Sequence, residues 1–315
     1  MPLASVPTSL VRAVRLADHL DVSPIYVKMD AHTGFALGGN KVRKLEFELA
    51  PERLEGITCV ITAGGPQSNH CRVIAAFAAR AGLRCVLVTQ GPAPDVPRGN
   101  ALLHRLFGAE IELVADRTDR VPGMERVANR VRDEGGRPLI VPIGASTGLG
   151  SLGYARAAVE LTAQLDALED GCHETVLFSS TSSGGTLAGL LLGLALQRRS
   201  NVRLYGVSAD APANELMETS IRLAREGAEL LGSEADLAAI AFRVIDDEVG
   251  EGYGIPTQAS TTAIRLFGAL EGMVLDPTYT AKAAAGLIAW TAEGLLSTGQ
   301  RLVFLHTGGH PGLLA

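Results

Sequence analysis
Cysteine, lysine and aromatic residues are scarce in this chain of 315 residues. The four cysteines form no C-x-x-C pair and lack the spacing of metal ligands, so we expect no metal site. Scattered thiols of this kind are typical of a reducing compartment. No apolar run is long enough to span a membrane, and the N-terminal segment, with Arg12 and Arg15, lacks the apolar core of a signal peptide. These absences predict a cytoplasmic protein.

Clusters of positive charge are missing as well. The net charge is -6 and no run of lysines and arginines occurs, which argues against nucleic acid as the main partner. Walker and H-E-x-x-H patterns are absent, so nucleotide hydrolysis and zinc-dependent hydrolysis lack support. Residues 148–153 fit G-x-G-x-x-G, but the next expected strand ends without the acidic residue that a nicotinamide site requires. We interpret these glycines as a tight entry into a helix.

Short apolar runs alternate with segments of helical periodicity along most of the chain. One set predicts strands at 59–62, 85–89, 110–114 and 139–143, with helices at 69–80, 100–106 and 124–133. A second set predicts strands at 25–29, 175–179, 203–207 and 302–305, with helices at 10–20, 151–165, 187–196, 214–231, 257–270 and 281–295. This alternation is typical of right-handed βαβ units. We expect an α/β fold of two lobes, each an open, mostly parallel, twisted sheet flanked by helices. The small lobe (45–150) would be inserted into a large lobe (1–44 and 151–315).

Ligands of open α/β sheets bind at the carboxyl ends of the strands, where glycine and hydroxyl residues gather in this chain. One such segment runs from Gly38 and Gly39 to Asn40 and Lys41, in a chain with only four lysines. The glycines let the backbone approach a flat ligand, and a lysine in a partly dry pocket can react with a carbonyl group. For any single lysine, a turn followed by a basic helix start is the simpler interpretation.

The segment from Ser179 to Thr186 follows an expected strand and contains only hydroxyl residues and glycine. Backbone N–H groups at the start of the next helix would form an anion site with Ser183, Gly184, Gly185 and Thr186. Phosphate is the natural ligand of such a cradle. A simple helix cap needs only one hydroxyl, so we favour the cradle.

A second strand-to-helix turn contains Gln67, Ser68, Asn69 and His70. A carboxylate would be stabilised at the N-terminus of the following helix, and Ser68 can serve there as a proton donor or nucleophile. A lone serine is more often a cap and a lone histidine more often a packing residue. Their combination with two amide side chains favours a site.

Two of the five tyrosines, Tyr253 and Tyr279, lie beside turn residues. Each is either a buried aromatic residue with a satisfied hydroxyl or a phenol that passes a proton near a cofactor. The sequence pattern leaves both interpretations open.

Together these motifs resemble the D-cysteine desulfhydrase and 1-aminocyclopropane-1-carboxylate deaminase family of fold-type II pyridoxal-phosphate enzymes. The resemblance covers nearly the whole chain. It rests on Gly39-Asn40-Lys41-Val42-Arg43-Lys44-Leu45-Glu46, Gln67-Ser68-Asn69-His70, Gly99-Asn100, Ser151-Leu152-Gly153-Tyr154, Ser183-Gly184-Gly185-Thr186, Tyr253-Gly254-Ile255-Pro256, Asp276-Pro277-Thr278-Tyr279-Thr280 and His306-Thr307-Gly308-Gly309.

The resemblance implies how pyridoxal 5'-phosphate would be held. Lys41 would bind it covalently and act as the base for the α-proton of the substrate. Asn40 would contact the ring hydroxyl, and Thr307 would meet the pyridine nitrogen. The phosphate would lie in the loop of Ser183, Gly184, Gly185 and Thr186.

The resemblance also implies how a small amino-acid substrate would be held. Its carboxylate would lie at Ser68, Asn69 and His70, and Ser68 would join the proton transfers. Tyr253 and Tyr279 would flank the reacting carbon. Because the similar enzymes are dimers, a homodimer is expected.

Several positions depart from the family pattern. Met29 and Ala31, Pro66 and the segment 257–259 differ from the usual residues, which predicts an altered substrate choice. Thr280 stands where ring-opening deaminases have an acid, and Thr307 is a neutral hydroxyl that does not favour a protonated pyridine nitrogen.

We therefore expect a lyase that performs β-elimination on D-cysteine or a β-substituted alanine, giving pyruvate, ammonia and the released β-group. Ring opening of 1-aminocyclopropane-1-carboxylate, cleavage of cysteate and a specialised biosynthetic lyase reaction remain alternatives. An interpretation from another class is a protein that only binds a phosphorylated metabolite.

Overall fold

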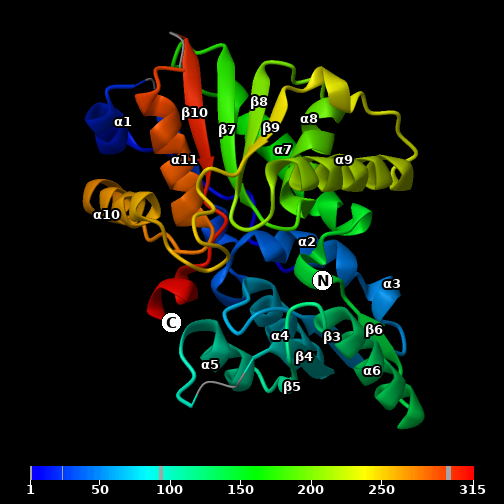
Figure 1. The fold of residues 1–315 in the computed structure, drawn as a ribbon. Helices are drawn as coiled ribbons and strands as arrows, with labels where there is room; N and C mark the ends of the chain where they lie inside the picture. Colours follow the sequence, from blue (N-terminus) through cyan, green and yellow to red (C-terminus); the bar gives the residue numbers. More distant parts are fainter. Residues whose placement is uncertain (1, 23, 92–94, 296–298) are drawn as a thin grey trace.

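The computed structural model describes residues 2–22, 24–91, 95–295 and 299–315. Within these ranges two sheets are formed, one in the upper and one in the lower part of Figure 1. The larger has the order β1-β2-β10-β7-β8-β9 and the smaller has the order β5-β4-β3-β6. Every neighbouring pair is parallel except β1 and β2, which are antiparallel. The predicted α/β class with two mostly parallel sheets is confirmed.

The strands of the larger sheet are β1 (Leu10–Arg12), β2 (Ile25–Lys28), β7 (Glu174–Thr181), β8 (Val202–Ser208), β9 (Phe242–Ile245) and β10 (Gln300–Leu305). Those of the smaller sheet are β3 (Cys59–Ala63), β4 (Arg84–Gln90), β5 (Glu110–Val114) and β6 (Pro138–Ile140). The α-helices are α1 (Val14–Leu20), α2 (Asn40–Glu48), α3 (Pro51–Leu54), α4 (Asn69–Ala81), α5 (Gly99–Leu106), α6 (Arg120–Asp133), α7 (Gly148–Asp166), α8 (Gly185–Leu196), α9 (Ala213–Leu230), α10 (Gln258–Glu271) and α11 (Thr280–Ala292).

Both faces of the larger sheet are buried, which is the usual arrangement for parallel strands. Alternate residues of β7 point to opposite faces of the sheet. Leu177 packs in a core with α7, α8 and α9, whereas Val176 and Phe178 pack in a core with α1, α10 and α11. The smaller sheet follows the same rule. Val60 of β3 packs in the core that includes α2 and α4, and Ile61 packs in the core with α6.

Two predicted elements differ from the structure, and one strand of the structure was not predicted. The predicted helix at 10–20 is wrong in its first part, because Leu10–Arg12 pairs with β2 as an antiparallel strand and the helix begins only at Val14. β6 ends at Ile140, so the predicted strand at 139–143 is too long. The edge strand β9 was not predicted. Pairing at a sheet edge depends on distant partners, which local periodicity does not contain.

The glycines at 148–153 lie in the first turns of α7. A Cβ at Gly153 would overlap the carbonyl oxygen of Arg43 in α2, and one at Gly189 of α8 would overlap that of Ser151. These glycines therefore allow α2, α7 and α8 to pack with their backbones in close approach. The predicted tight helix entry agrees with Gly148 and Gly150, because a Cβ at Gly150 would lie only 2.2 Å from the carbonyl oxygen of Ala145 in the preceding turn. The close approach of α2 at Gly153 was not predicted.

All strands of the smaller sheet lie inside the predicted insertion at 45–150. Helix α2 spans the predicted boundary after residue 44, and it contacts both α7 and α4. It lies between the two sheets in Figure 1. The division into lobes at these residues stays a prediction. Among the described residues, the helices are too short or too polar to cross a membrane.

Candidate active site

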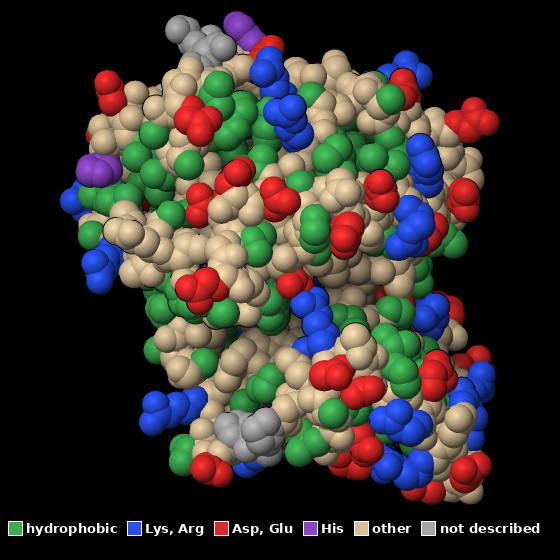
Figure 2. All heavy atoms as spheres, viewed as in Figure 1, with side chains coloured by type: hydrophobic (Ala, Val, Ile, Leu, Met, Phe, Trp, Pro, Cys, Tyr) green, Lys and Arg blue, Asp and Glu red, His purple; other side chains and the backbone are tan. Residues whose placement is uncertain are grey.

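A cavity of about 110 Å³ lies where the carboxyl ends of strands from both sheets meet. Its lining brings together every residue that the sequence singled out for catalysis, cofactor binding or substrate binding: Asn40, Lys41, Ser68, Asn69, His70, Ser183, Gly184, Gly185, Thr186, Tyr253, Tyr279 and Thr307. The individual roles of these residues stay predictions. Figure 2 shows basic side chains near the narrowing between the upper and lower parts of the molecule.

Lys41 lies in the first turn of α2, which begins at Asn40 directly after Gly38 and Gly39, two glycines with positive φ. Gly39 has φ 108°, and a Cβ there would lie 3.0 Å from the carbonyl oxygen of Thr307. The amide of Asn40 donates to the same carbonyl at 2.9 Å, so the start of α2 is fixed to the end of β10. Burial lowers the pKa of Lys41 to about 8, which raises its unprotonated fraction near neutral pH.

The loop after β7 has the form of an anion cradle. Gly184, with φ 75°, turns the chain into α8, and the side chain of Asn40 donates to Thr186 Oγ1 at 3.0 Å. The Ser183 hydroxyl lies 2.7 Å from that of Ser146. Backbone N–H groups at a helix start and nearby hydroxyls are the donors that phosphate prefers.

Lys44 adds a positive charge to this cradle, and sequence reasoning missed it. Its ammonium group donates to Ser146 Oγ at 2.9 Å, and a Cβ at Gly185 would lie only 2.6 Å from its Nζ. The side chain is fully buried, and in the described chain no carboxylate lies within ion-pair distance of it. Burial, together with the charge of Lys41, holds the pKa of Lys44 well below its usual range. A phosphate would supply the missing counter-charge.

Ser146 is the centre of residues 144–148, which fit G-x-S-x-G formally. The nucleophile of that motif stands on a turn between a strand and a helix and is activated by a histidine. Here Ser146 follows a 3-10 turn, and its hydroxyl contacts Lys44 and Ser183 instead. Ser146 thus forms part of the cradle.

Thr307 lies at the end of β10, and its hydroxyl is 3.0 Å from that of Ser180 at the end of β7. Both residues line the cavity. No Asp or Glu occurs among the described lining residues, so this end of the cavity offers neutral hydroxyls. Thr280, in contrast, is absent from the lining, because its hydroxyl donates to Asp276 Oδ1 at 2.7 Å in the turn that starts α11.

Ser68 and Asn69 begin α4, and both side chains already have partners. Ser68 Oγ accepts from the amide of Cys71 at 3.2 Å as the helix cap. Asn69 Oδ1 accepts from Arg72 at 2.6 Å and from Asn100 at 2.9 Å. Arg72 also donates to the carbonyl of Gly38 at 2.7 Å, so α4 is tied to the turn that carries Lys41.

His70 is buried, and its tautomer follows from its neighbours. The Thr62 hydroxyl donates its proton to the carbonyl of Val141 at 2.7 Å, so it accepts from His70 Nε2 at 2.8 Å. The proton is therefore on Nε2, and Nδ1 carries a lone pair. Within the described residues Nδ1 has no hydrogen-bond partner. Burial and the charges of Lys41 and Lys44 lower the pKa of His70, which keeps the ring neutral.

Tyr253 and Tyr279 both line the cavity and contact each other there. Their hydroxyls form a hydrogen bond and their rings stack edge to face, with centroids 5.9 Å apart. Burial raises the pKa of Tyr279 well above its usual range, so the pair is protonated at neutral pH. A phenol pair of this kind shares one proton and keeps another for donation.

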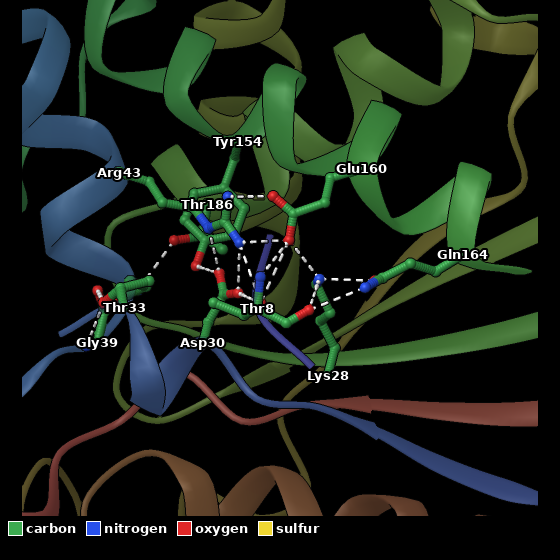
Figure 3. Close-up of polar contacts among 11 residues, drawn as sticks. Thr8, Lys28, Asp30, Thr33, Gly39, Arg43, Tyr154, Glu160, Gln164 and Thr186 are labelled. Carbon is green, nitrogen blue, oxygen red and sulfur yellow. Dashed lines mark hydrogen bonds and ion pairs between the residues drawn. The ribbon is translucent and has the colours of Figure 1, made fainter. Parts of the chain in front are cut away.

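Buried charges behind the cavity hold α2 in place (Figure 3). Arg43 of α2 forms ion pairs with Asp30 at 2.8 Å and with Glu160 of α7 at 2.9 Å. Lys28 also pairs with Glu160, and Tyr154 donates to Asp30 at 2.6 Å. Because Arg43 lies two residues after Lys41, this network positions the turn of α2 that carries Lys41.

A family model described as pyridoxal-phosphate dependent enzyme matches residues 2–308. The chain belongs to this family. The D-cysteine desulfhydrase of Salmonella newport (strain SL254) is 38% identical, with all of this chain and 95% of the relative aligned. The same identity and coverage hold for the D-cysteine desulfhydrase of Salmonella choleraesuis (strain SC-B67). The predicted family and its pyridoxal-phosphate cofactor are confirmed.

Solved structures agree with this assignment. The crystal structure of an ACC deaminase homologue superposes with a TM-score of 0.88 at 32% identity, and the match covers 99% of this chain and 92% of that chain. The Escherichia coli diaminopropionate ammonia lyase, at 17% identity, has a TM-score of 0.70 over 97% of this chain and 83% of its own. The second likeness shows the common fold alone.

The cavity of this family member fits the cofactor at both ends. The cradle and Lys44 suit a phosphate dianion, Lys41 offers an amine of lowered pKa, and the hydroxyls of Ser180 and Thr307 suit a ring nitrogen. Met29, Ala31, Pro66 and the segment 257–259, which depart from the family pattern, lie outside the cavity lining. They therefore leave the donors for the cofactor intact.

Proposed function
We propose that the protein is a lyase that uses pyridoxal phosphate to eliminate the β-substituent of a small amino acid. D-cysteine or a β-substituted alanine would yield pyruvate, ammonia and the released group. The 38% identity to D-cysteine desulfhydrases along the whole chain supports this class of substrate.

The main support for β-elimination, as opposed to ring opening, is the pair of hydroxyl groups of Ser180 and Thr307. A carboxylate at this position would favour the protonated pyridine nitrogen, whereas a hydroxyl donates to the unprotonated nitrogen. An unprotonated pyridine ring withdraws fewer electrons than a protonated one, so it delocalises the electron pair at the α-carbon less well. Rapid loss of a good β-leaving group then becomes the easier reaction. The neutral lining around Thr307 thus favours elimination over ring opening.

When bound, pyridoxal phosphate withdraws electrons from the α-carbon of the amino acid that it holds. The Lys41 amine takes the proton from that carbon, and the electron pair left behind expels the β-substituent as the Cα–Cβ double bond forms. Water then hydrolyses the three-carbon fragment to pyruvate and ammonia. The lowered pKa of Lys41 suits it to accept the proton near neutral pH.

The substrate carboxylate would lie on the first turn of α4, where Ser68 and Asn69 line the cavity. His70 completes this turn, but its Nδ1 has no proton to donate, so the carboxylate would be held by Ser68, Asn69 and the backbone N–H groups of the turn. The hydroxyl pair of Tyr253 and Tyr279 would supply a proton near the leaving group. We further propose a cytoplasmic homodimer. Light scattering of the purified protein that gives the mass of a monomer would contradict the dimer.

A panel of β-substituted alanines in both enantiomers, with 1-aminocyclopropane-1-carboxylate beside it, tests the reaction. We expect pyruvate and ammonia from the β-substituted alanines. Ketobutyrate from the cyclopropane substrate, with every β-substituted alanine inert, would establish ring opening instead. The ACC deaminase homologue among the similar structures makes this the second candidate.

Borohydride reduction of the holoenzyme followed by peptide mapping tests the role of Lys41. The cofactor adduct is expected on Lys41, and Lys41→Ala should lose turnover. An adduct on Lys44 or Lys282 would overturn the assignment.

A further inference from the structure
Positive charge is in excess around the cavity. Among the described lining residues Lys41, Arg117 and Arg120 are basic, and none is acidic. Lys41 is assigned to the cofactor, and Arg117 pairs with Asp210 and covers the ring of Tyr253 at 5.6 Å. Arg120 is the lining cation that the proposed reaction leaves without a role.

Arg120 is the first residue of α6 and is 6% exposed. Its Nε donates to the side-chain oxygen of Gln90 at 2.8 Å, and Nη2 donates to the same oxygen. Over the described part of the chain, no carboxylate lies within ion-pair distance of Arg120. Gln90 orients the guanidinium of Arg120 without neutralising its charge. The other N–H groups of the guanidinium stay available to donate to a ligand.

The position of Arg120 is unfavourable in the absence of an anion. A buried cation without a counter-charge loses hydration that a neutral amide replaces only in part. The N-terminus of α6 carries a positive dipole end, which opposes a cation in the first turn. Burial and the nearby charge of Arg117 lower the pKa of Arg120 in agreement with this strain. The charge of an anionic ligand would offset these unfavourable terms.

Arg120 lies on the substrate side of the cavity. A Cβ at Gly65 would lie 3.7 Å from its Nη2, and Gly65 belongs to the turn that leads into Ser68. Its charge also acts on Tyr253, where it opposes the rise in pKa that burial causes. Arg120 is thus placed between the proposed carboxylate site and the tyrosine pair. The α-carboxylate already has the first turn of α4, so a second anionic group would face Arg120.

We propose that Arg120, oriented by Gln90, binds an anionic group on the β-carbon of the substrate. Among β-substituted alanines, the preferred substrates would be those whose β-substituent is a sulfonate, phosphate ester or sulfate ester, ahead of the neutral thiol of D-cysteine. This inference rests on the proposed β-elimination. The Cα proton goes to Lys41, the Cβ–S or Cβ–O bond breaks with its electron pair on the departing sulfite, phosphate or sulfate, and water completes hydrolysis to pyruvate and ammonia.

Turnover of matched substrates gives the first test. In the wild type, kcat/KM for O-phosphoserine or cysteate should exceed that for β-chloroalanine of the same configuration by tenfold or more. Arg120→Gln should reduce this ratio by about ten- to hundredfold, mainly through KM, which is the range for loss of a charge-assisted hydrogen bond. Arg126→Gln is the matched control, because Arg126 is an exposed arginine of the same helix and is absent from the lining. It should leave the ratio unchanged.

Binding gives a second test that does not depend on turnover. Aspartate and asparagine have nearly the same shape and differ in the charge of the β-substituent. Their dissociation constants are measured from the change in the visible absorption of the holoenzyme. The wild type should bind aspartate at least tenfold more tightly than asparagine, and Arg120→Gln should remove that preference.

The outcomes separate this inference from the proposed function. Equal losses for charged and neutral substrates in Arg120→Gln would place the α-carboxylate at Arg120 and overturn the inference. Elimination without any preference for an anionic substituent would overturn it as well. Absence of elimination with every amino acid would refute the proposed reaction, while a preference for aspartate that depends on Arg120 would still support the anion site.

Discussion
In its proposed role, the amine of Lys41 must be unprotonated to capture the cofactor, so its pKa would set the pH dependence of cofactor binding. Burial lowers this pKa to about 8. The unprotonated fraction of Lys41 therefore rises as the pH passes from 7 to 9 and is nearly complete above that range. We expect the rate at which the apoprotein binds pyridoxal phosphate covalently to follow the same curve. Stopped-flow absorbance at a series of pH values measures it. A rate that keeps rising through pH 10 would show a lysine with an ordinary pKa.

Lys44 provides a second prediction for a single residue. Its buried charge lies at the cradle, so Lys44→Met should weaken binding of pyridoxal phosphate by roughly ten- to hundredfold, the range of a charge-assisted hydrogen bond. Equilibrium dialysis of the apoprotein measures the dissociation constant. Ser146→Ala removes one neutral hydroxyl from the same cradle and should have a smaller effect. An equal effect of both changes would contradict a charge role for Lys44.

Residues with a distinctive local context were the ones that sequence could predict. Lys41, the loop of Ser183 and the turn of Ser68 stand beside glycines at strand or helix ends, where backbone donors are free. Lys44 and Arg120 have no such context. Their significance comes from burial without an acidic partner, and only tertiary packing reveals that property.

Helix packing gives a prediction for a whole element. A Cβ at Gly153 of α7 would overlap the backbone of α2 at Arg43, so Gly153→Ala should lower the free energy of unfolding by about 1–3 kcal/mol, the usual cost of overpacking. Displacement of α2 should also weaken cofactor binding, because Lys41 lies on that helix. Denaturant unfolding monitored by circular dichroism measures the change.

Gly268 of α10 is the matched control for Gly153. A Cβ there has only one neighbour, a carbonyl oxygen at 4.0 Å, so Gly268→Ala adds no clash. Alanine is a better helix former than glycine, and this change should raise the free energy of unfolding by up to about 1 kcal/mol. Equal destabilisation by both substitutions would contradict the packing argument.

Helices and strands with a clear periodic pattern of apolar residues were predicted to within a few residues. β5 agrees at both ends, and α4 agrees to within one residue. β1 and β9 were missed because they are short edge strands that depend on partners far away in the sequence. The same dependence explains why the packing role of Gly153 was not predicted: the helix α2 that requires it is distant in sequence.

At the scale of the whole molecule, the alternation of strands and helices was enough to predict two mostly parallel sheets. It could not predict how the N-terminal segment is anchored. The amide of Thr8 donates to Glu160 at 2.8 Å, and its hydroxyl donates to Asp30 at 2.7 Å, so residues near the N-terminus join the buried charges around Arg43 (Figure 3). The network links the start of the chain, β2, α2 and α7.

This network predicts how the stability of the molecule depends on pH. Burial disfavours the charge of Glu160, but hydrogen bonds and ion pairs with Arg43 and Lys28 outweigh it and lower its pKa to about 2. A carboxylate with a lowered pKa stabilises the fold fully above its unfolded pKa of about 4.5, and the contribution is lost as the pH falls towards 2. We expect the free energy of unfolding to decrease across that window.

Glu160→Gln tests the origin of this pH dependence. The variant leaves Arg43 and Lys28 with less negative charge in a buried site, so the free energy of unfolding near neutral pH should fall by roughly 3 kcal/mol. The slope of stability against pH between 4.5 and 2 should flatten, because the group that gains a proton there is gone. Glu229→Gln, an exposed acid of α9, should keep the slope of the wild type. Denaturant unfolding at several pH values measures both quantities. A wild-type slope in Glu160→Gln would mean that other carboxylates govern unfolding in acid.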